Sequence, residues 1–288
     1  VEVPQAILVL DATERKTTLY LPPTDPATER SEGPGQATIG PDALRELSGI
    51  EEIKAAEALA DDIRKAKTIY VVLGPSETWS SSRWGERQAD RLVAADPWDG
   101  STSRTGRFLD RLRVHNPGAE FRDLTPILNA MRLVKSEREL ELLRRAGRLS
   151  ALALTEAMRS TRPGVKEYEL AAIAAYVFRV HGAFGEGYRP IVASGPNAWH
   201  GHYHRNDCAL EGGELILMDC APDYSYYTSD IGRMWPVNGT YSPVQRELYG
   251  FVVEYHKVLL ARLGPGKTSD EVLAEAAEEM RTALQGWS

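Results

Sequence analysis

The feature that most constrains the fold is an apolar run that ends on an acidic residue. Leu215–Met218 has the composition of a buried strand, and Asp219 follows it directly. A turn-prone patch, residues 221–225, comes next, and Tyr226–Thr228 is typical of a second strand that leads to Asp230. A hairpin that folds back within this stretch would place the two aspartates opposite each other, with Cβ atoms roughly 4.5–5.5 Å apart.

Two negative charges at that distance oppose folding unless a positive charge lies between them. A divalent cation, or two cations about 3.5–4 Å apart, would supply that charge. The alternative is that the two aspartates are ordinary turn formers or solvated strand ends. The apolar run favours the metal, because a carboxylate at the end of a core strand is poorly solvated. From these residues alone, metal binding by Asp219 and Asp230 stays a hypothesis beside the turn or strand-end alternative.

The spacing of the two aspartates resembles that of the first two metal ligands in the pita-bread metallopeptidases. Ten residues separate them, and an Ile-x-Arg triplet follows the second. This family includes methionine aminopeptidases, prolidases and Xaa-Pro aminopeptidases. Two positions depart from the family pattern. Tyr226 stands where a turn glycine is common, and Gly232 stands where a threonine would offer a hydroxyl near the ligands.

Composition limits the remaining classes of function. The chain has 288 residues, of which 42% are hydrophobic and 26% charged, as in a globular protein of one large or two ordinary domains. Its net charge of −7 argues against nucleic acid or an anionic membrane as partner, because either would favour a basic face. Cys208 and Cys220 are too few for a disulfide framework, and no stretch approaches the ~20 apolar residues of a membrane span. A cytoplasmic setting is expected.

Residues 1–125 are predicted to form a first domain of the α/β class. Its elements are a hairpin, a Pro/Gly-rich loop without regular structure, an amphipathic helix and a buried strand. In chain order they are Ile7–Leu10 with Thr17–Leu21, residues 21–35, Glu51–Lys65 and Thr68–Leu73. The domain is similar to the N-terminal domain of creatinases and Xaa-Pro aminopeptidases, most clearly in the loop. That similarity implies a role in oligomer contacts and substrate access.

Residues 126–288 are predicted to form a second domain with internal symmetry. Ser136 and Glu139 make a capping box at the start of a long helix, on which Gly147 indicates close packing against a sheet. A helix, a Pro-Gly turn and a second helix then occur twice; the later helices are Glu167–Val180, Gln245–Leu263 and, after a Thr268–Glu271 capping box, Glu271–Leu284. The segment MRLVKSERELELLRRAG resembles the first pita-bread helix of Xaa-Pro aminopeptidases. We therefore expect an α+β fold with an incomplete pita-bread domain.

Three histidines alternate along the chain before the first aspartate: His200, His202 and His204. On a strand they would share one face, and three imidazoles on one face could bind zinc by themselves. The alternative, which we favour, is that only one of them is functional. A Ser-Gly-x-Asn turn precedes His202 and Asn-Asp follows it, and this context resembles the family segment that carries a substrate-pocket histidine. The resemblance implies that His202 is a catalytic and substrate-binding residue, and that Tyr188 lies near the metal centre and contacts the substrate.

The resemblance implies a Xaa-Pro aminopeptidase truncated at both ends. Such an enzyme removes an N-terminal residue that precedes proline, so its partner is a peptide with proline in the second position. The resemblance implies two divalent ions, manganese first and cobalt or zinc as alternatives; Asp219 would bind one of them and Asp230 would bridge both. The family uses a histidine and two glutamates as further ligands, which would lie beyond Ser288. The 288-residue chain alone is therefore expected to bind metal weakly and to be inactive. A homo-oligomer, dimer or tetramer, is also implied.

Three other classes stay open. An Xaa-Pro dipeptidase (prolidase) or a creatinase-like hydrolase shares the fold. A catalytically dead pita-bread binding protein would purify without stoichiometric divalent ion, and retention of Asp219, Asp230 and His202 argues against it. A plain α/β binding module would leave the aspartate pair unexplained.

Overall fold

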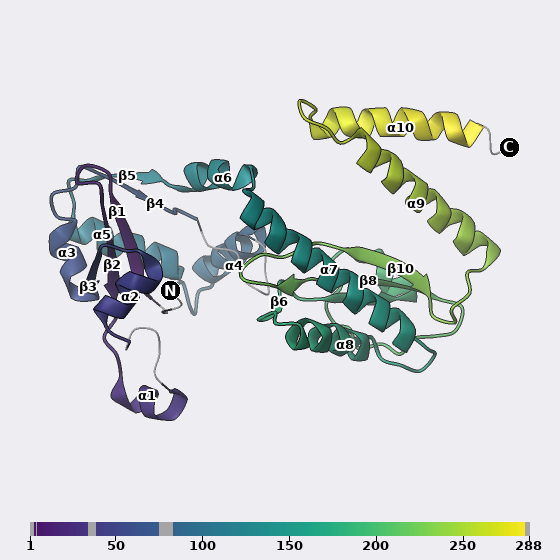
Figure 1. The fold of residues 1–288 in the computed structure, drawn as a ribbon, viewed down its shortest axis with the longest axis horizontal. Coiled ribbons are helices and arrows are strands. Elements are labelled where there is room, and N and C mark those ends of the chain that lie inside the picture. Colours follow the sequence, from purple (N-terminus) through teal and green to yellow (C-terminus); the bar gives the residue numbers. More distant parts are fainter. Residues whose placement is uncertain (1–2, 4, 34–38, 75–82, 286–288) are drawn as a thin grey trace. The chain divides into compact units, whose positions relative to one another are not determined.

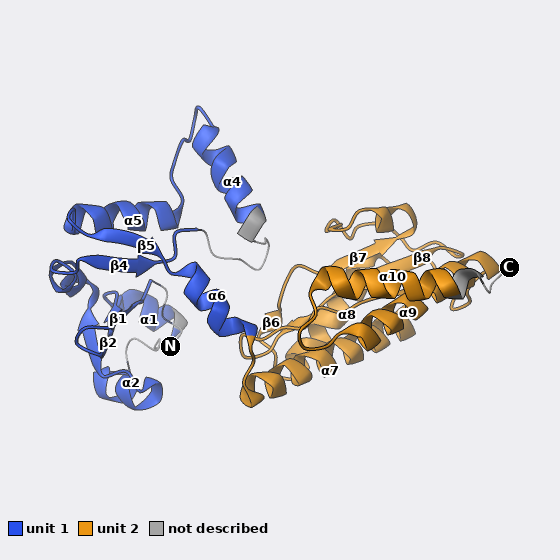
Figure 2. Cartoon of the chain, turned by 90° about the horizontal axis from the view of Figure 1, so that it is seen from above, with its two compact units in different colours: residues 1–76, 83–133 blue, residues 77–82, 134–288 orange. Residues whose placement is uncertain are grey.

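The chain divides into two compact units. The computed structural model describes residues 3, 5–33, 39–74 and 83–285 (Figure 1). Contacts group residues 1–76 with 83–133 in unit 1, and residues 77–82 with 134–288 in unit 2 (Figure 2). Within the described ranges, no helix is both long enough and apolar enough to cross a membrane.

Unit 1 contains two small sheets and short helices. Strand β1 (Ile7–Asp11) pairs antiparallel with β2 (Lys16–Leu21), as the sequence predicted. Strand β4 (Thr68–Val71), also predicted, pairs parallel with β5 (Glu120–Asp123). The helices of this unit are α1 (Pro26–Glu32), α2 (Pro41–Ser48), the short η2 (Ala56–Ala58) and α3 (Leu59–Asp62), α4 (Arg83–Ala95), α5 (Arg104–His115) and α6 (Thr125–Leu133).

The predicted helix over Glu51–Lys65 is wrong in its first half. Glu52–Ala55 forms strand β3, which pairs parallel with β2 and places Ile53 opposite the buried Leu19. The segment turns helical only at η2 and α3. Apolar spacing of 3.6 residues was compatible with a helix, but pairing with β2 satisfies the backbone and extends the sheet.

The Pro/Gly-rich loop is also wrong in part, because α1 lies within it. The Asp25 side chain accepts hydrogen bonds from the backbone N–H groups of Ala27 and Thr28, and Pro26 is at the start of the helix. Aspartate as N-cap followed by proline is a helix-start signal that outweighs the turn composition. Residues 34–38 of the predicted loop lie outside the described residues.

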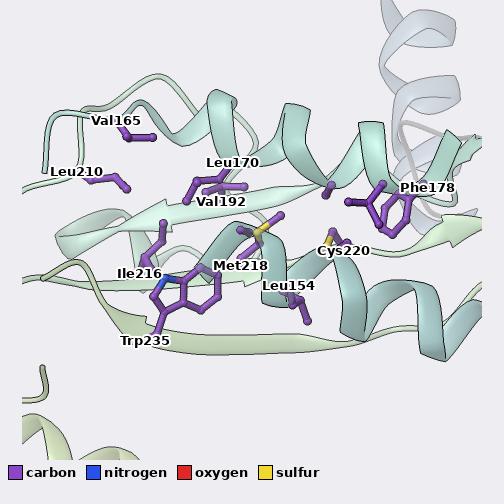
Figure 3. Close-up of a cluster of buried hydrophobic side chains, with 14 of the residues drawn as sticks. Leu154, Val165, Leu170, Phe178, Val192, Leu210, Ile216, Met218, Cys220 and Trp235 are labelled. Carbon is purple, nitrogen blue, oxygen red and sulfur yellow. The ribbon is translucent and has the colours of Figure 1, made fainter. Parts of the chain in front are cut away.

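Unit 2 packs two long helices against one face of a three-stranded antiparallel sheet. The helices are α7 (Glu137–Ser160) and α8 (Glu167–Val180), and the strands run in the order β10 (Gly232–Pro236), β8 (Leu215–Asp219) and β7 (Ile191–Ser194). Figure 3 shows the core between them, where Met218 and Val192 meet Leu154 and Leu170.

Helix α7 begins with the predicted capping box. The Ser136 hydroxyl accepts from the N–H of Glu139, and the Glu139 carboxylate accepts from the N–H of Ser136. The prediction for Gly147 is wrong, since a Cβ atom there would meet nothing within 4 Å. The fully buried small residues of α7 are instead alanines, Ala146, Ala153 and Ala157.

The two helices predicted after the sheet are confirmed as α9 (Pro243–Arg262) and α10 (Ser269–Gln285). Thr268 and Glu271 exchange the predicted capping hydrogen bonds, although α10 begins two residues earlier than expected. Two short strands, β6 (Gly185–Glu186) and β9 (Pro222–Asp223), pair antiparallel beside the end of β8, and the short helix η3 (Gly195–Trp199) follows β7.

Candidate metal centre

Strand β8 carries Asp219 to the end of the sheet. Its side chains alternate, with Ile216 and Met218 fully buried against the helices. Asp219 lies on the opposite face, because successive side chains of a strand point to opposite sides. The predicted strand that ends on a half-buried carboxylate is therefore confirmed.

The predicted pairing of the two aspartates is wrong. The register of β8 with β10 places Asp219 opposite Gly232, and Asp230 lies before β10, outside the ladder. Residues 226–228 do not form the expected strand. Instead, Tyr224 and Tyr227 exchange backbone hydrogen bonds around a two-residue turn. The strand returns only at residue 232, where Met234 and Trp235 pair with the apolar run of β8.

The turn itself is left-handed. Its central residues, Ser225 and Tyr226, have φ angles of 53° and 68°. Two positive φ angles are the signature of a type I′ hairpin turn, whose twist matches that of the strands. Tyr226 thus adopts the conformation that a glycine favours, held by a hydrogen bond from its N–H to Asp223 and by contact of its ring with Phe184.

Both aspartates nevertheless converge on one hydroxyl group. The phenol of Tyr188 donates to Oδ1 of Asp219 at 2.5 Å and lies 3.4 Å from Oδ1 of Asp230. Asp230 is exposed to solvent, whereas Asp219 is half-buried. Among the described residues, neither carboxylate forms an ion pair with lysine or arginine. The structure thus brings together three of the residues singled out in the sequence, although not by the expected register.

The electrostatics of this pair are unfavourable in the protein alone. Burial raises the pKa of Asp219 above its ordinary value, and the charge of Asp230 raises it further; the hydrogen bond from Tyr188 and the charge of His202 oppose the shift without cancelling it. Burial and the adjacent Asp219 carboxylate also raise the pKa of Tyr188 far above its usual range. A cation beside the two carboxylates would reverse the effect on Asp219.

The histidine segment is not the predicted strand. Residues 195–199 form η3, and the chain continues irregularly to residue 208. His202 is exposed, and its ring stacks on that of His204 with centroids 6.2 Å apart. His200 is also exposed, and burial lowers the pKa of His204. The three imidazoles therefore do not share a strand face; His202 is the one whose charge acts on Asp219.

The sequence analysis missed Glu167, which organises this segment. Its side chain is fully buried in the first turn of α8. Its two oxygens accept five hydrogen bonds, from the N–H and hydroxyl of Ser194, the amide of Asn197, the hydroxyl of Tyr203 and the N–H of Cys208. Burial alone would raise the pKa of Glu167, but these hydrogen bonds outweigh it and hold the pKa below its ordinary value. The only signal in the sequence was an acidic residue in a first helical turn, which is common.

Comparison with known proteins identifies the family. The model of metallopeptidase family M24 matches residues 141–287. The chain belongs to metallopeptidase family M24. It is 40% identical over 162 residues to the Xaa-Pro aminopeptidase of Escherichia coli, covering 56% of this chain and 37% of that protein. It is 32% identical over 277 residues to the Xaa-Pro aminopeptidase of Haemophilus influenzae, covering 94% and 58%.

Solved structures of M24 peptidases share the fold. An E. coli aminopeptidase P variant in complex with substrate superposes with a TM-score of 0.76 at 30% identity, over 98% of this chain and 61% of the other. Proline aminopeptidase P II from Yersinia pestis gives the same TM-score and identity, over 96% and 60%. The predicted α+β class and pita-bread fold are therefore confirmed, and this chain spans about 60% of the length of those structures.

M24 metallopeptidases bind divalent metal ions, and the residues of this chain fit such an ion. Asp219 and Asp230 offer oxygen ligands, and a cation between them would oppose the burial and the Asp230 charge that raise the pKa of Asp219. A second acidic group, Glu167 with Asp207 and Cys208, has ligand atoms within 4.8 Å of one another. Both oxygens of Glu167 are already saturated by hydrogen-bond donors. The aspartate pair is therefore the better candidate among the described residues.

Proposed function

We propose that this chain forms part of a dinuclear metallopeptidase that removes an N-terminal residue preceding proline. The observation that carries the proposal is the convergence of Asp219 and Asp230 on the Tyr188 hydroxyl without a lysine or arginine partner among the described residues. Like charges held this close are tolerated best when a cation joins them. Similarity to Xaa-Pro aminopeptidases of two bacteria supports the reaction class.

In this proposal Asp219 and Asp230 would hold two divalent ions. Manganese is the first choice, with cobalt or zinc as alternatives; a zinc-substituted E. coli aminopeptidase P is among the similar structures. A pair of such ions activates water and polarises the peptide carbonyl. The substrate is a peptide with proline in the second position.

The remaining residues orient these groups. The Tyr188 hydroxyl donates to Asp219 and so holds the rotamer of that carboxylate, which leaves its other oxygen free to bind metal. His202 is exposed beside Asp219, where its imidazole can hydrogen-bond the reacting peptide and stabilise developing charge. These roles for Tyr188 and His202 come from the family resemblance together with their position.

The proposal extends to the rest of the chain. We infer that residues 1–125 serve as a creatinase-type N-terminal domain and that the protein is a cytoplasmic dimer or tetramer. The division by contacts falls between Leu133 and Val134. Size measurement in solution tests the oligomer.

The decisive experiment is a calorimetric titration of the full chain with Mn²⁺. Asp219→Asn and Asp230→Asn should each weaken binding by at least about 100-fold, more than residues that only orient a ligand usually contribute. Asp207→Asn, which alters the other acidic group, is the matched control and should leave binding within about twofold. Binding that depends on Asp207 but not on Asp219 would refute the proposed centre.

The reaction class needs a separate assay. In the protein as it occurs, a peptide with proline in the second position should be cleaved after its first residue, and the same peptide with alanine there should be a poorer substrate. Release of a dipeptide product, or cleavage only of Xaa-Pro dipeptides, would favour the dipeptidase alternative. Stoichiometric metal with no cleavage of either peptide would overturn the reaction proposed.

A further inference from the structure

One polar residue interrupts the apolar face of α7. The buried residues of this helix are alanines and leucines except for Ser150, which is fully buried. A serine within a helix commonly turns its hydroxyl back to the carbonyl four residues earlier. The Ser150 hydroxyl is instead engaged by two groups far along the chain, so its position on this face serves contacts outside the helix.

Both partners of Ser150 adjoin the candidate metal ligands. The hydroxyl donates to the carbonyl oxygen of Cys220 at 3.2 Å, and it lies 2.8 Å from the hydroxyl of Ser229. Cys220 directly follows Asp219, and Ser229 directly precedes Asp230. A single side chain thus joins the two ends of the segment that lies between the two aspartates.

Other contacts with α7 hold the same segment at its hairpin turn, farther from the aspartates. The Tyr227 hydroxyl donates to Glu139 at 2.9 Å, and the guanidinium of Arg145 lies 5.7 Å from the ring centre of Tyr224. These contacts fix the tip of the hairpin, whereas Ser150 acts at its base. Because Asp230 lies outside the β8–β10 ladder, backbone pairing between these strands does not set its distance from Asp219.

We propose that Ser150 is a positioning residue that sets the separation of Asp219 and Asp230. The proposal rests on the proposed function, since the separation matters only if the two carboxylates bind metal together. Ser150 keeps the two backbone segments that carry Asp219 and Asp230 at a fixed spacing before any ion binds. Metal binding then requires less ordering of the loop. It does not touch the ion or the substrate.

The test compares Ser150→Ala with Ala157→Gly, another fully buried change on the same face of α7. Ser150→Ala should weaken Mn²⁺ binding of the full chain about tenfold, the lower end of the range for residues that orient ligands. Ala157→Gly should lower the melting temperature, because glycine weakens a helix, but leave Mn²⁺ affinity within about twofold. Adding Ser229→Ala to Ser150→Ala should cost little more, because the two hydroxyls act as one unit.

A metal-free measurement separates this proposal from the proposed function. Hydrogen–deuterium exchange over residues 219–230 should quicken about tenfold in Ser150→Ala and stay unchanged in Ala157→Gly. Unchanged exchange and unchanged Mn²⁺ affinity in Ser150→Ala would refute the positioning role. If Mn²⁺ binding of the parent chain is insensitive to Asp219→Asn, the metal centre itself fails. The exchange comparison then decides alone whether Ser150 fixes the two backbone segments.

Discussion

Each unit contains a tyrosine that donates a hydrogen bond to an aspartate, and the two pairs differ in the burial of the aspartate and in the charge beside it. In unit 1, Tyr20 donates to Asp62 at 2.7 Å, and the Lys54 ammonium lies 2.8 Å from the same carboxylate oxygen. In unit 2, Tyr188 donates to Asp219, and the strongest charge effect on Asp219 comes from the negative Asp230.

The pKa values of the two carboxyl groups differ accordingly. The hydrogen bond from Lys54, followed by that from Tyr20, holds the pKa of Asp62 below its ordinary value. Burial raises the pKa of Asp219, and Asp230 adds to the rise. The Tyr188 hydrogen bond alone does not offset the burial of Asp219, whereas Asp62 is more exposed and also has Lys54 beside it. In the proposed metal centre, a bound ion would supply at Asp219 the positive charge that Lys54 supplies at Asp62.

Glu167 is the limiting case, a buried carboxylate satisfied without any cation, and its loss should have the largest effect. Glu167→Ala would leave five donors without their acceptor, so we expect the free energy of unfolding to fall by about 3 kcal/mol or more. Chemical denaturation measures it. Asp207→Ala, which removes an exposed neighbour, should cost less than about 0.5 kcal/mol. Equal losses would contradict a structural role for Glu167.

The next effect concerns the two tyrosines. Tyr188→Phe removes the hydroxyl that lies at 2.5 Å from Asp219, and should lower the free energy of unfolding of the metal-free protein by about 1.5 kcal/mol. Tyr20→Phe should cost less, because Asp62 keeps Lys54. Thermal melts at matched pH compare the two variants. A larger loss for Tyr20→Phe would contradict the stronger dependence of Asp219 on its tyrosine.

The two aspartates should respond to pH with opposite signs. The folded-state pKa of Asp219 is raised, so its ionisation destabilises the metal-free protein as pH rises through the interval between the unfolded and folded pKa values. Asp219→Asn should therefore be more stable than the parent at pH 7, by roughly 1 kcal/mol or less, and lose this advantage on acidification.

Asp62 provides the control. Its folded-state pKa is lowered, so it stabilises the protein above the unfolded pKa, and that contribution is lost as pH falls through the folded pKa. Asp62→Asn should be less stable than the parent at pH 7, by about 0.5 kcal/mol, since the Lys54 pair is partly exposed. Denaturation curves between pH 3 and pH 7 with chelator present would show both trends. If both substitutions changed the free energy of unfolding at pH 7 in the same direction, the predicted contrast between the two aspartates would be wrong.

Gly232→Thr should have the smallest effect, and it tests whether a hydroxyl beside Asp219 contributes to the site. A Cβ atom at residue 232 would meet Asp219 and the Met218 carbonyl at ordinary contact distances of 3.7–3.9 Å, so its addition displaces neither neighbour. We expect stability to rise by about 0.5 kcal/mol, because β-branched residues suit strands better than glycine. The added hydroxyl should strengthen Mn²⁺ binding if it reaches Asp219, and Gly232→Val, which lacks the hydroxyl, is the matched control. Calorimetry that finds equal gains for both would exclude a hydroxyl effect.

Local signals in the sequence located most elements of unit 2. The capping boxes at Ser136 and Thr268 and the limits of α8 follow from residues a few positions apart. In unit 1, Glu52–Ala55 was assigned to a helix because its apolar period suits both structures. Its pairing with β2 depends on residues more than thirty positions away.

Local sequence patterns were enough to predict that an apolar strand ends at Asp219 and to place the helices before and after it. Only the tertiary structure decided that Asp219 faces Gly232, that Tyr188 joins it to Asp230, and that Ser150 ties the two backbone segments. The physical reason is the separation along the chain of the residues that each feature depends on. Capping and strand composition depend on neighbours in the chain, whereas register and convergence depend on packing a whole sheet against α7 and α8. Alternative strand registers that fit the local sequence equally well differ in free energy only when the whole sheet is packed against the helices.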